Sequence, residues 1–337
     1  MLCASPEITK RDAAILLRGL RREPPLMTPG YLALRQHAAW IDVSARARIR
    51  VAGEDRARLL HAMTTNQIQA LKPGEGCYAF FLNAQGRILA DVNVLCFEDH
   101  LLLDSEPELG AKIYEHLDRY IIADDAALEN LAGQTAAIAV EGPEAELALR
   151  RLGAPAPEAA GSHVAWNTRT VARLNTTGSG GYFLILASAE KAAVVDALAA
   201  AGIVEASPAD ARQVRIENGH PRYGEEITER YLVQETAQLQ AVNFAKGCYL
   251  GQEIVERVRS RGQVHRLLRR LEMETANVPA AGSKLAVDGA TAAEVASAVF
   301  SPALNKTVAL AYVRAPFAEP GARLNLDGTP AVVSLPG

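Results

Sequence analysis

The sequence predicts a multi-domain α+β protein that ends in a small all-β barrel or sandwich domain. Its 337 residues are 49% hydrophobic, which is enough for two or three buried cores. Up to residue 265, strand patterns are separated by both hairpin turns and helical patterns, which favours α+β over a doubly wound parallel sheet. We therefore expect an N-terminal arm at 1–30, a mixed region at 31–265 that divides near residue 130, and a barrel domain at 266–337.

The first half of the chain alternates short strands and helices. In the arm, residues 8–20 predict an amphipathic helix, which Pro24, Pro25 and Pro29 would end. Residues 47–51 alternate with period two, as in a half-buried strand. Further strands are predicted at 78–82, 88–96 and 100–104, with helices opening at 53–55 and covering 107–121.

A second α+β stretch follows residue 130. A strand at 136–140 precedes a helix at 143–152, and strands at 168–174 and 181–187 are expected to pair as a hairpin before a helix at 189–201. Ser207 and Pro208 are typical of an N-cap and a first helical position, and Gly219 is suitably placed to end that helix.

The last 70 or so residues contain strand patterns and no long helix. The pairs Asp288-Gly289 and Asp327-Gly328 are strong hairpin signals. The expected strands cover 267–273, 284–287, 295–300, 308–313, 322–326 and 331–335, which indicates a barrel or sandwich.

Composition and charge exclude several classes of protein. No apolar run reaches the length of a membrane-spanning helix, so no membrane partner is expected. The net charge of −4 argues against a general nucleic-acid coat. The four cysteines are scattered, with no CxxC pair, which suits a reducing compartment. Together with the absence of a signal or transit pattern, this predicts a cytoplasmic protein.

The segment 246–253 is the most informative for chemistry. A helix is predicted to begin near Gly251, so Cys248 would precede a helix N-terminus, two residues after Lys246. The helix dipole and the lysine charge both favour a thiolate, which is a nucleophile or a soft metal ligand. The alternative is a small buried hydrophobic side chain, the role we assign to Cys77 and Cys96. One cysteine cannot hold an iron–sulfur cluster alone, so further ligands would come from a partner chain, a second copy or a small thiol.

Residues 246–253 closely resemble the K-G-C-Y-x-G-Q-E signature of the YgfZ-type folate-binding family, which is related to the T-protein (aminomethyltransferase) of the glycine cleavage system. The resemblance covers about residues 31–335 and implies a T-protein-like folate-binding fold, a C-terminal barrel and a cavity for tetrahydrofolate or another reduced folate. It also rests on Asp42-x-Ser44, Gly53-x-Asp55, Tyr78, Leu82-Asn83, Gly86, Asp91, Arg215–Gly219 and the stretch from Ser301-Pro302 to Tyr312.

The resemblance implies roles for individual residues. Glu217 would bind the pterin, since a carboxylate can accept two adjacent N–H donors; its alternative is an exposed acid at a helix end. Asp91 would face the reactive nitrogens of folate, or else point outward from its strand. Tyr78 would stack on the pterin, or else belong to the core. The candidate catalytic residues are Cys248, also a shared iron–sulfur ligand, and Asp91, and the candidate cofactor-binding residues are Glu217, Asp91, Tyr78, Arg215, Lys246 and Arg257.

Arginines are concentrated between residues 257 and 270. They are interpreted either as a solvated face joining two domains or as a docking patch for the glutamate tail of folate, an acidic partner or RNA. No aromatic residue lies between them, which weakens the RNA interpretation. His61, His163 and His220 show no metal-ligand spacing and are taken as structural.

The function implied is folate-dependent assistance in iron–sulfur cluster assembly or repair, including for iron–sulfur enzymes that modify tRNA. The partners would be iron–sulfur assembly or client proteins. The alternative is a T-protein-like aminomethyltransferase or demethylase that transfers one-carbon units to tetrahydrofolate. The paired aspartates of the T-protein correspond here to Ala90-Asp91, which shifts the expectation away from an enzyme. A tRNA-binding module, supported only by the arginines, is a third hypothesis.

Overall fold

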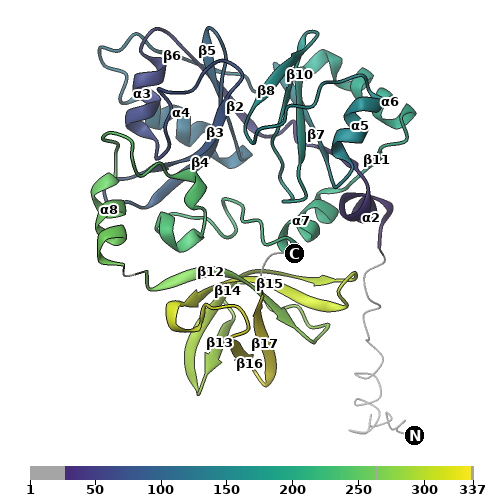
Figure 1. Ribbon diagram of the computed structural model, residues 1–337, viewed down its shortest axis with the longest axis vertical. Helices are drawn as coiled ribbons and strands as arrows, with labels where there is room; N and C mark the ends of the chain where they lie inside the picture. The colour runs from purple at the N-terminus through teal and green to yellow at the C-terminus, as the bar shows by residue number, and fades with distance from the viewer. Residues whose placement is uncertain (1–26, 263, 335–337) are drawn as a thin grey trace, which may run out of the picture.

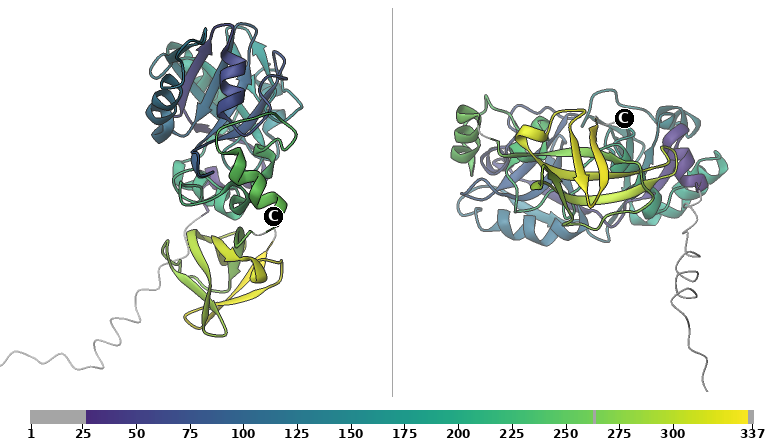
Figure 2. Two further views of the ribbon diagram at one scale, coloured as in Figure 1. Left: turned by 90° about the vertical axis from the view of Figure 1, so that its left-hand side faces the viewer. Right: turned by 90° about the horizontal axis from the view of Figure 1, so that it is seen from below.

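The computed structural model describes residues 27–262 and 264–334. Two sheets lie side by side above a closed barrel (Figure 1), and a side view shows the barrel as a separate layer beneath them (Figure 2). This arrangement confirms the α+β, multi-domain prediction with a C-terminal barrel. The helix expected at 8–20 lies outside the described residues.

The end of the predicted arm already belongs to a helix. Pro29 opens α2 (Pro29–Gln36), and the hydroxyl of Thr28 caps it by accepting a 3.0 Å hydrogen bond from the backbone N–H of Tyr31. Proline at a first helical position favours helix initiation, which fits this role of Pro29. Whether the three prolines also end the helix expected at 8–20 concerns residues outside the described ranges.

The first sheet is antiparallel, with strand order β3-β4-β5-β2-β6. All four strands predicted between residues 47 and 104 are present, whereas the short, mostly exposed β6 was not predicted. Their apolar faces form a core with α3 and α4. The elements are β2 (Ala47–Ala52), α3 (Arg56–Met63), β3 (Gly76–Leu82), β4 (Ile88–Cys96), β5 (His100–Ser105), η1 (Pro107–Leu109), α4 (Gly110–Asp118) and β6 (Ala127–Asn130).

The second sheet has the order β11-β1-β7-β10-β9-β8. The strands β9 and β10 pair antiparallel, as predicted. However, β1 precedes the whole first sheet in sequence, so the two subdomains are not consecutive segments divided near residue 130. The elements are β1 (Ala39–Asp42), β7 (Thr135–Glu141), α5 (Ala145–Arg151), β8 (His163–Trp166), β9 (Arg169–Ala172), β10 (Gly181–Ala187), α6 (Lys191–Ala200) and β11 (Val204–Glu205).

Helix α7 (Pro208–Glu217) connects the second sheet to the barrel (Figure 1). Ser207 and Asp210 form a reciprocal capping box, and Gly219 beyond its end has φ +69°, as the predicted start and stop require. The chain then passes through η3 (Val233–Thr236) and η4 (Leu239–Ala241) to α8 (Gln252–Arg261), which lies beside the first sheet.

The barrel closes in the order β12-β15-β14-β13-β16-β17, which decides between the barrel and the sandwich. Asp288 and Asp327 have φ near +48°, each followed by a glycine with positive φ, as expected for two-residue hairpin turns. The strands are β12 (Arg266–Met273), β13 (Lys284–Val287), β14 (Ala290–Ser301), β15 (Lys306–Arg314), β16 (Arg323–Leu326) and β17 (Thr329–Ser334). Within the described ranges, no helix combines the length and apolar character that crossing a membrane requires.

Candidate functional site

A cavity of about 740 Å³ lies where the two sheets meet α7 and the loop that follows it. Because each of these three parts supplies a wall, the cavity exists only in the assembled fold. Its polar and aromatic lining includes Asp42, Arg46, Asn66, Cys77, Tyr78, Asp91, Asn93, Glu106, Arg173, Asn175, Arg212, Arg215, His220, Arg222, Glu225 and Gln240.

Tyr78 and Asp91 meet on the cavity face of the β3–β4 hairpin. Tyr78 is paired with Asn93 in register, and Asp91 is two residues from Asn93 on the same face. The Tyr78 hydroxyl donates a 2.8 Å hydrogen bond to Oδ2 of Asp91. Burial raises the pKa of Asp91 to about 6, although this hydrogen bond lowers it, and burial together with Asp91 raises the pKa of Tyr78 well above its usual value. Both predicted residues are therefore placed in the cavity, with an acid that changes charge near neutral pH.

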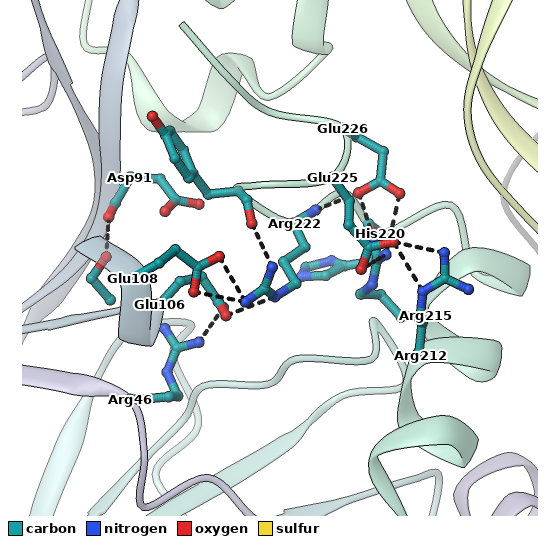
Figure 3. A network of polar contacts seen from close by, with 12 residues as sticks. Arg46, Asp91, Glu106, Glu108, Arg212, Arg215, His220, Arg222, Glu225 and Glu226 are labelled. Carbon is teal, nitrogen blue, oxygen red and sulfur yellow. Dashed lines mark hydrogen bonds and ion pairs between the residues drawn. The ribbon is translucent and has the colours of Figure 1, made fainter. Parts of the chain in front are cut away.

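A chain of arginine–carboxylate pairs crosses the cavity wall (Figure 3). Arg46 pairs with Asp104 at 2.7 Å and with Glu106. Arg222 pairs with Glu106 and Glu108, at 2.8 and 2.9 Å. Burial alone would raise the pKa of Glu106, but the two arginines hold it below its usual value. These charges fix one another and thereby fix the shape of the wall.

The predicted residue Arg215 lines the cavity, but its guanidinium is already engaged. It contacts Glu226 at 2.8 Å and Glu225 at 3.1 Å, and it donates to the carbonyl oxygen of His220. Beside it, burial and the charge of Arg215 lower the pKa of His220 to about 4, so this imidazole is neutral at pH 7. His220 also lines the cavity, whereas the sequence predicted a purely structural role for it.

Glu217 does not line the cavity, in contrast to its predicted role as the pterin-binding acid. Its side chain is 2% exposed, accepts hydrogen bonds from Tyr31 at 2.9 and 3.2 Å, and forms an ion pair with Arg35. Burial and Glu217 together raise the pKa of Tyr31 to about 12. The carboxylate points from the last turn of α7 toward α2 and holds those helices together, so the geometry does not support a contact with a ligand in the cavity.

The ammonium group of Lys246 is engaged by backbone carbonyl oxygens, whereas the sequence predicted that its charge acts on the thiol of Cys248. Its ammonium group donates to the carbonyl oxygens of His61, Thr64 and Asn66, at 2.6, 2.6 and 2.8 Å. Burial lowers the pKa of Lys246 to about 8, which still leaves three protons at pH 7 for three acceptors. The neighbouring thiol is that of Cys77, whose pKa is raised to about 12 by burial despite the lysine charge.

The three described cysteines differ in burial and in their place relative to the cavity. Cys96 is buried in the core of the first sheet, as expected. Cys77 is half-buried and packs against the same core, as expected, and it also lines the cavity. Cys248 is exposed on the loop before α8 and does not line the cavity. Within residues 27–262 and 264–334, no group of three or more potential metal-ligating side chains gathers in one place.

The remaining predicted residue, Arg257, lies on α8 and pairs with Glu253 one turn earlier. Arg259 is similarly next to Glu256 at 3.4 Å and lies over the ring of Phe244. The predicted arginine patch is therefore interrupted by acids and separate from the cavity lining.

Sequence reasoning missed several residues of the cavity wall. Arg46 and Glu106 are 60 residues apart, and no local pattern connects them. A signal did exist for His220 and Arg222, because polar residues directly follow the Arg215–Gly219 motif at the end of a predicted helix.

Two subdomains that share a cavity lined by charged, aromatic and apolar side chains, followed by a closed barrel, define a multi-domain protein of the α+β class. The family model described as the GCVT N-terminal domain matches residues 26–246, and that of the glycine cleavage T-protein C-terminal barrel domain matches residues 266–333. The chain belongs to the glycine cleavage T-protein family.

Relatives of known name support this membership. The chain is 30% identical over 305 residues to an aminomethyltransferase of Streptomyces avermitilis, covering 86% of this chain and 82% of that protein. It is 26% identical over 260 residues to a putative chloroplastic transferase of Arabidopsis thaliana, covering 74% of this chain but only 59% of that protein. The crystal structure of the glycine cleavage system aminomethyltransferase T from Bartonella henselae superimposes with a TM-score of 0.83 at 23% identity, covering 92% of this chain and 90% of that chain, and so shares its fold.

Proposed function

We propose that the central cavity binds tetrahydrofolate or another reduced folate. The observation that carries this proposal is the carboxyl group of Asp91, which is 9% exposed, opens into a cavity of about 740 Å³ and has a pKa raised to about 6. An acid of this kind accepts hydrogen bonds from the N–H groups of a reduced pteridine when ionised and donates one when protonated.

Two further lining residues suit the two ends of a folate molecule. Tyr78 offers an aromatic ring beside the acid. At another part of the lining, Arg173 has no carboxylate partner among the described residues and donates only to Pro157 and Tyr182, so its guanidinium is suited to the glutamate tail. A bound reduced folate would supply nitrogen atoms that carry one-carbon units.

The finer proposal is a YgfZ-type accessory role in iron–sulfur cluster assembly or repair, including for tRNA-modifying enzymes. Its support is the segment 246–253, in which Cys248 is exposed on a loop outside the cavity and is therefore accessible to a partner protein. The cluster would be cargo of that partner, and Cys248 would offer one thiolate to it. Direct tRNA binding has little support, because Arg257 and Arg259 lie beside glutamates.

The second candidate is an aminomethyltransferase, the name carried by several relatives. It is favoured by Asp91, because a carboxyl group with a pKa of about 6 is suited to proton transfer at neutral pH. The residue before it, Ala90, is not an acid, so any mechanism that requires paired carboxylates at this point is disfavoured.

An anaerobic calorimetric titration with tetrahydrofolate tests the binding proposal. We expect Asp91→Asn to weaken binding by about 1.5–3 kcal/mol, because one charge-assisted hydrogen bond is lost. The matched control is Asp99→Asn, which removes an exposed acid in the turn between β4 and β5 that pairs with Arg50 and His100 and does not line the cavity. Equal affinity of wild type and Asp91→Asn would refute the site.

A second experiment separates the accessory role from the transferase. Cys248→Ser is expected to abolish maturation of a client iron–sulfur enzyme in cells lacking the protein, while leaving tetrahydrofolate affinity unchanged. Full rescue by Cys248→Ser, combined with turnover of an aminomethyl donor that depends on Asp91, would instead establish the transferase.

A further inference from the structure

One wall of the cavity is held by a carboxylate that has no contact with the cavity itself. Arg215, His220, Pro221, Arg222 and Glu225 all line it and come from one stretch of chain. This stretch folds back on itself and is closed by Glu226, which is fully buried.

Three groups converge on the Glu226 side chain. Arg215 donates to both carboxylate oxygens, at 2.8 and 3.2 Å, and the backbone N–H of Arg222 donates to one of them at 2.9 Å (Figure 3). The third donor is the hydroxyl of Ser297, which belongs to the barrel. The carbonyl oxygen of Glu226 also accepts a 2.9 Å hydrogen bond from the hydroxyl of Tyr312 in β15. Two barrel strands therefore hold the residue that closes the wall.

The Ser297 hydroxyl lies on the outer face of the barrel because of an irregularity in β14. Val295 and Ala298 both belong to the barrel core, although alternation along a regular strand would place residues three apart on opposite faces. A register shift between Val295 and Ser297 in the β14–β15 pairing resolves the conflict, because the extra residue of a bulge changes the face on which the following residues lie. As a result Ser297 points away from the barrel core, toward Glu226.

We propose that Glu226 and Ser297 are positioning residues through which the C-terminal barrel sets the shape of the ligand cavity. Without the Ser297 hydroxyl, the Glu226 carboxylate loses its hydrogen bond to the barrel. Among the described residues, only Arg215 and the backbone N–H of Arg222 then hold it in place. The loop from His220 to Glu225 then loses its fixed place against the cavity. This inference rests on the proposed binding of a reduced folate only for its effect on affinity.

The test compares three variants of the full chain. Ser297→Ala removes the hydroxyl and Ser297→Thr retains it. Thr307→Val removes a different buried barrel hydroxyl, which donates to the carbonyl oxygens of Thr275 and Asn277, at 2.8 and 3.4 Å. Hydrogen–deuterium exchange of the ligand-free protein reports on the wall directly, because the Arg222 amide is bonded to Glu226. Anaerobic calorimetry with tetrahydrofolate reports on the cavity.

We expect Ser297→Ala to accelerate exchange in residues 219–226 on the order of tenfold and to raise the dissociation constant for tetrahydrofolate by roughly 3- to 10-fold. Ser297→Thr should restore both, and Thr307→Val should change neither. Unchanged exchange in Ser297→Ala would overturn the positioning role, as would faster exchange with unchanged affinity. If wild type does not bind tetrahydrofolate, the proposed function fails, while the exchange measurement still decides whether the barrel holds the wall.

Discussion

The hydroxyl of Tyr31 donates a 2.9 Å hydrogen bond to the carboxylate of Glu217, so this acid joins α2 to α7 instead of facing the cavity. The same carboxylate forms an ion pair with Arg35. The acid that looked most like a ligand anchor is therefore a structural connection between the first described helix and the helix that leads to the barrel.

Glu217→Ala should lower the free energy of unfolding by about 1–3 kcal/mol, because the buried Tyr31 hydroxyl loses its acceptor. Arg35 loses its partner too, but its side chain is 29% exposed and can turn to water. Urea unfolding measures the effect. Glu217→Gln is the control, since its amide oxygen still accepts from Tyr31, and it should recover part of the loss. A loss of tetrahydrofolate affinity without a loss of stability would contradict this assignment.

Asp91→Asn should stabilise the protein increasingly as pH rises from about 4 to above 6. The pKa of Asp91 is raised from 3.8 to about 6, so the folded state favours the protonated acid and loses stability as pH rises through that range. The neutral amide avoids this loss and can still accept from Tyr78. At pH 7.5 the gain should reach about 1–3 kcal/mol, since one pKa unit corresponds to about 1.4 kcal/mol.

Thermal unfolding of wild type and Asp91→Asn at pH 4.5 and 7.5 checks this prediction. The difference between the two proteins should be small at the lower pH and favour the variant at the higher one. A variant that is less stable by the same amount at both pH values would show that ionisation of Asp91 carries no cost in the folded protein.

Gly251→Ala should displace α8 and the loop that carries Cys248. Gly251 has φ +85°, and a Cβ atom there would lie 2.6 Å from the carbonyl oxygen of Asn83. The matched control is Gly262→Ala at the other end of the same helix, where φ is +63° but nothing lies within 4 Å of the added carbon. The control should cost only about 1 kcal/mol, from backbone strain alone. Thermal unfolding that ranks the two variants equally would rule out the steric argument.

Cys248 should react with a thiol reagent faster than Cys77 and Cys96 in the native protein. Cys248 is exposed, whereas Cys96 is buried and Cys77 is half-buried with a pKa raised to about 12 by burial. Labelling is best followed in a Cys3→Ser background, so that only these three thiols report. The fast phase should disappear in Cys248→Ser. Its persistence there would place the reactive thiol in the cavity, at Cys77.

Local sequence patterns determined the elements and the order of the domains. The strands of the first sheet, the capped start of α7, the start of α8 near Gly251 and the Asp-Gly hairpins of the barrel follow from periodicity, capping and turn chemistry, which act over a few residues. The short segments β1, β6, β8 and β11 were missed, because strands this short carry too little pattern to distinguish them from loops.

The site was decided by tertiary structure. The family resemblance alone predicted that Tyr78 and Asp91 face the ligand. The structure brings them together on one face of the β3–β4 hairpin, a relationship set by strand register. The directions of the Glu217 and Lys246 side chains did not follow from the sequence, because each depends on a partner that is distant along the chain. Glu217 accepts from Tyr31, and Lys246 donates to the carbonyl oxygen of His61. A sequence motif fixes which chemical group is present, whereas burial and long-range hydrogen bonds, which form only when the chain is assembled, decide whether that group faces a ligand or holds the fold together.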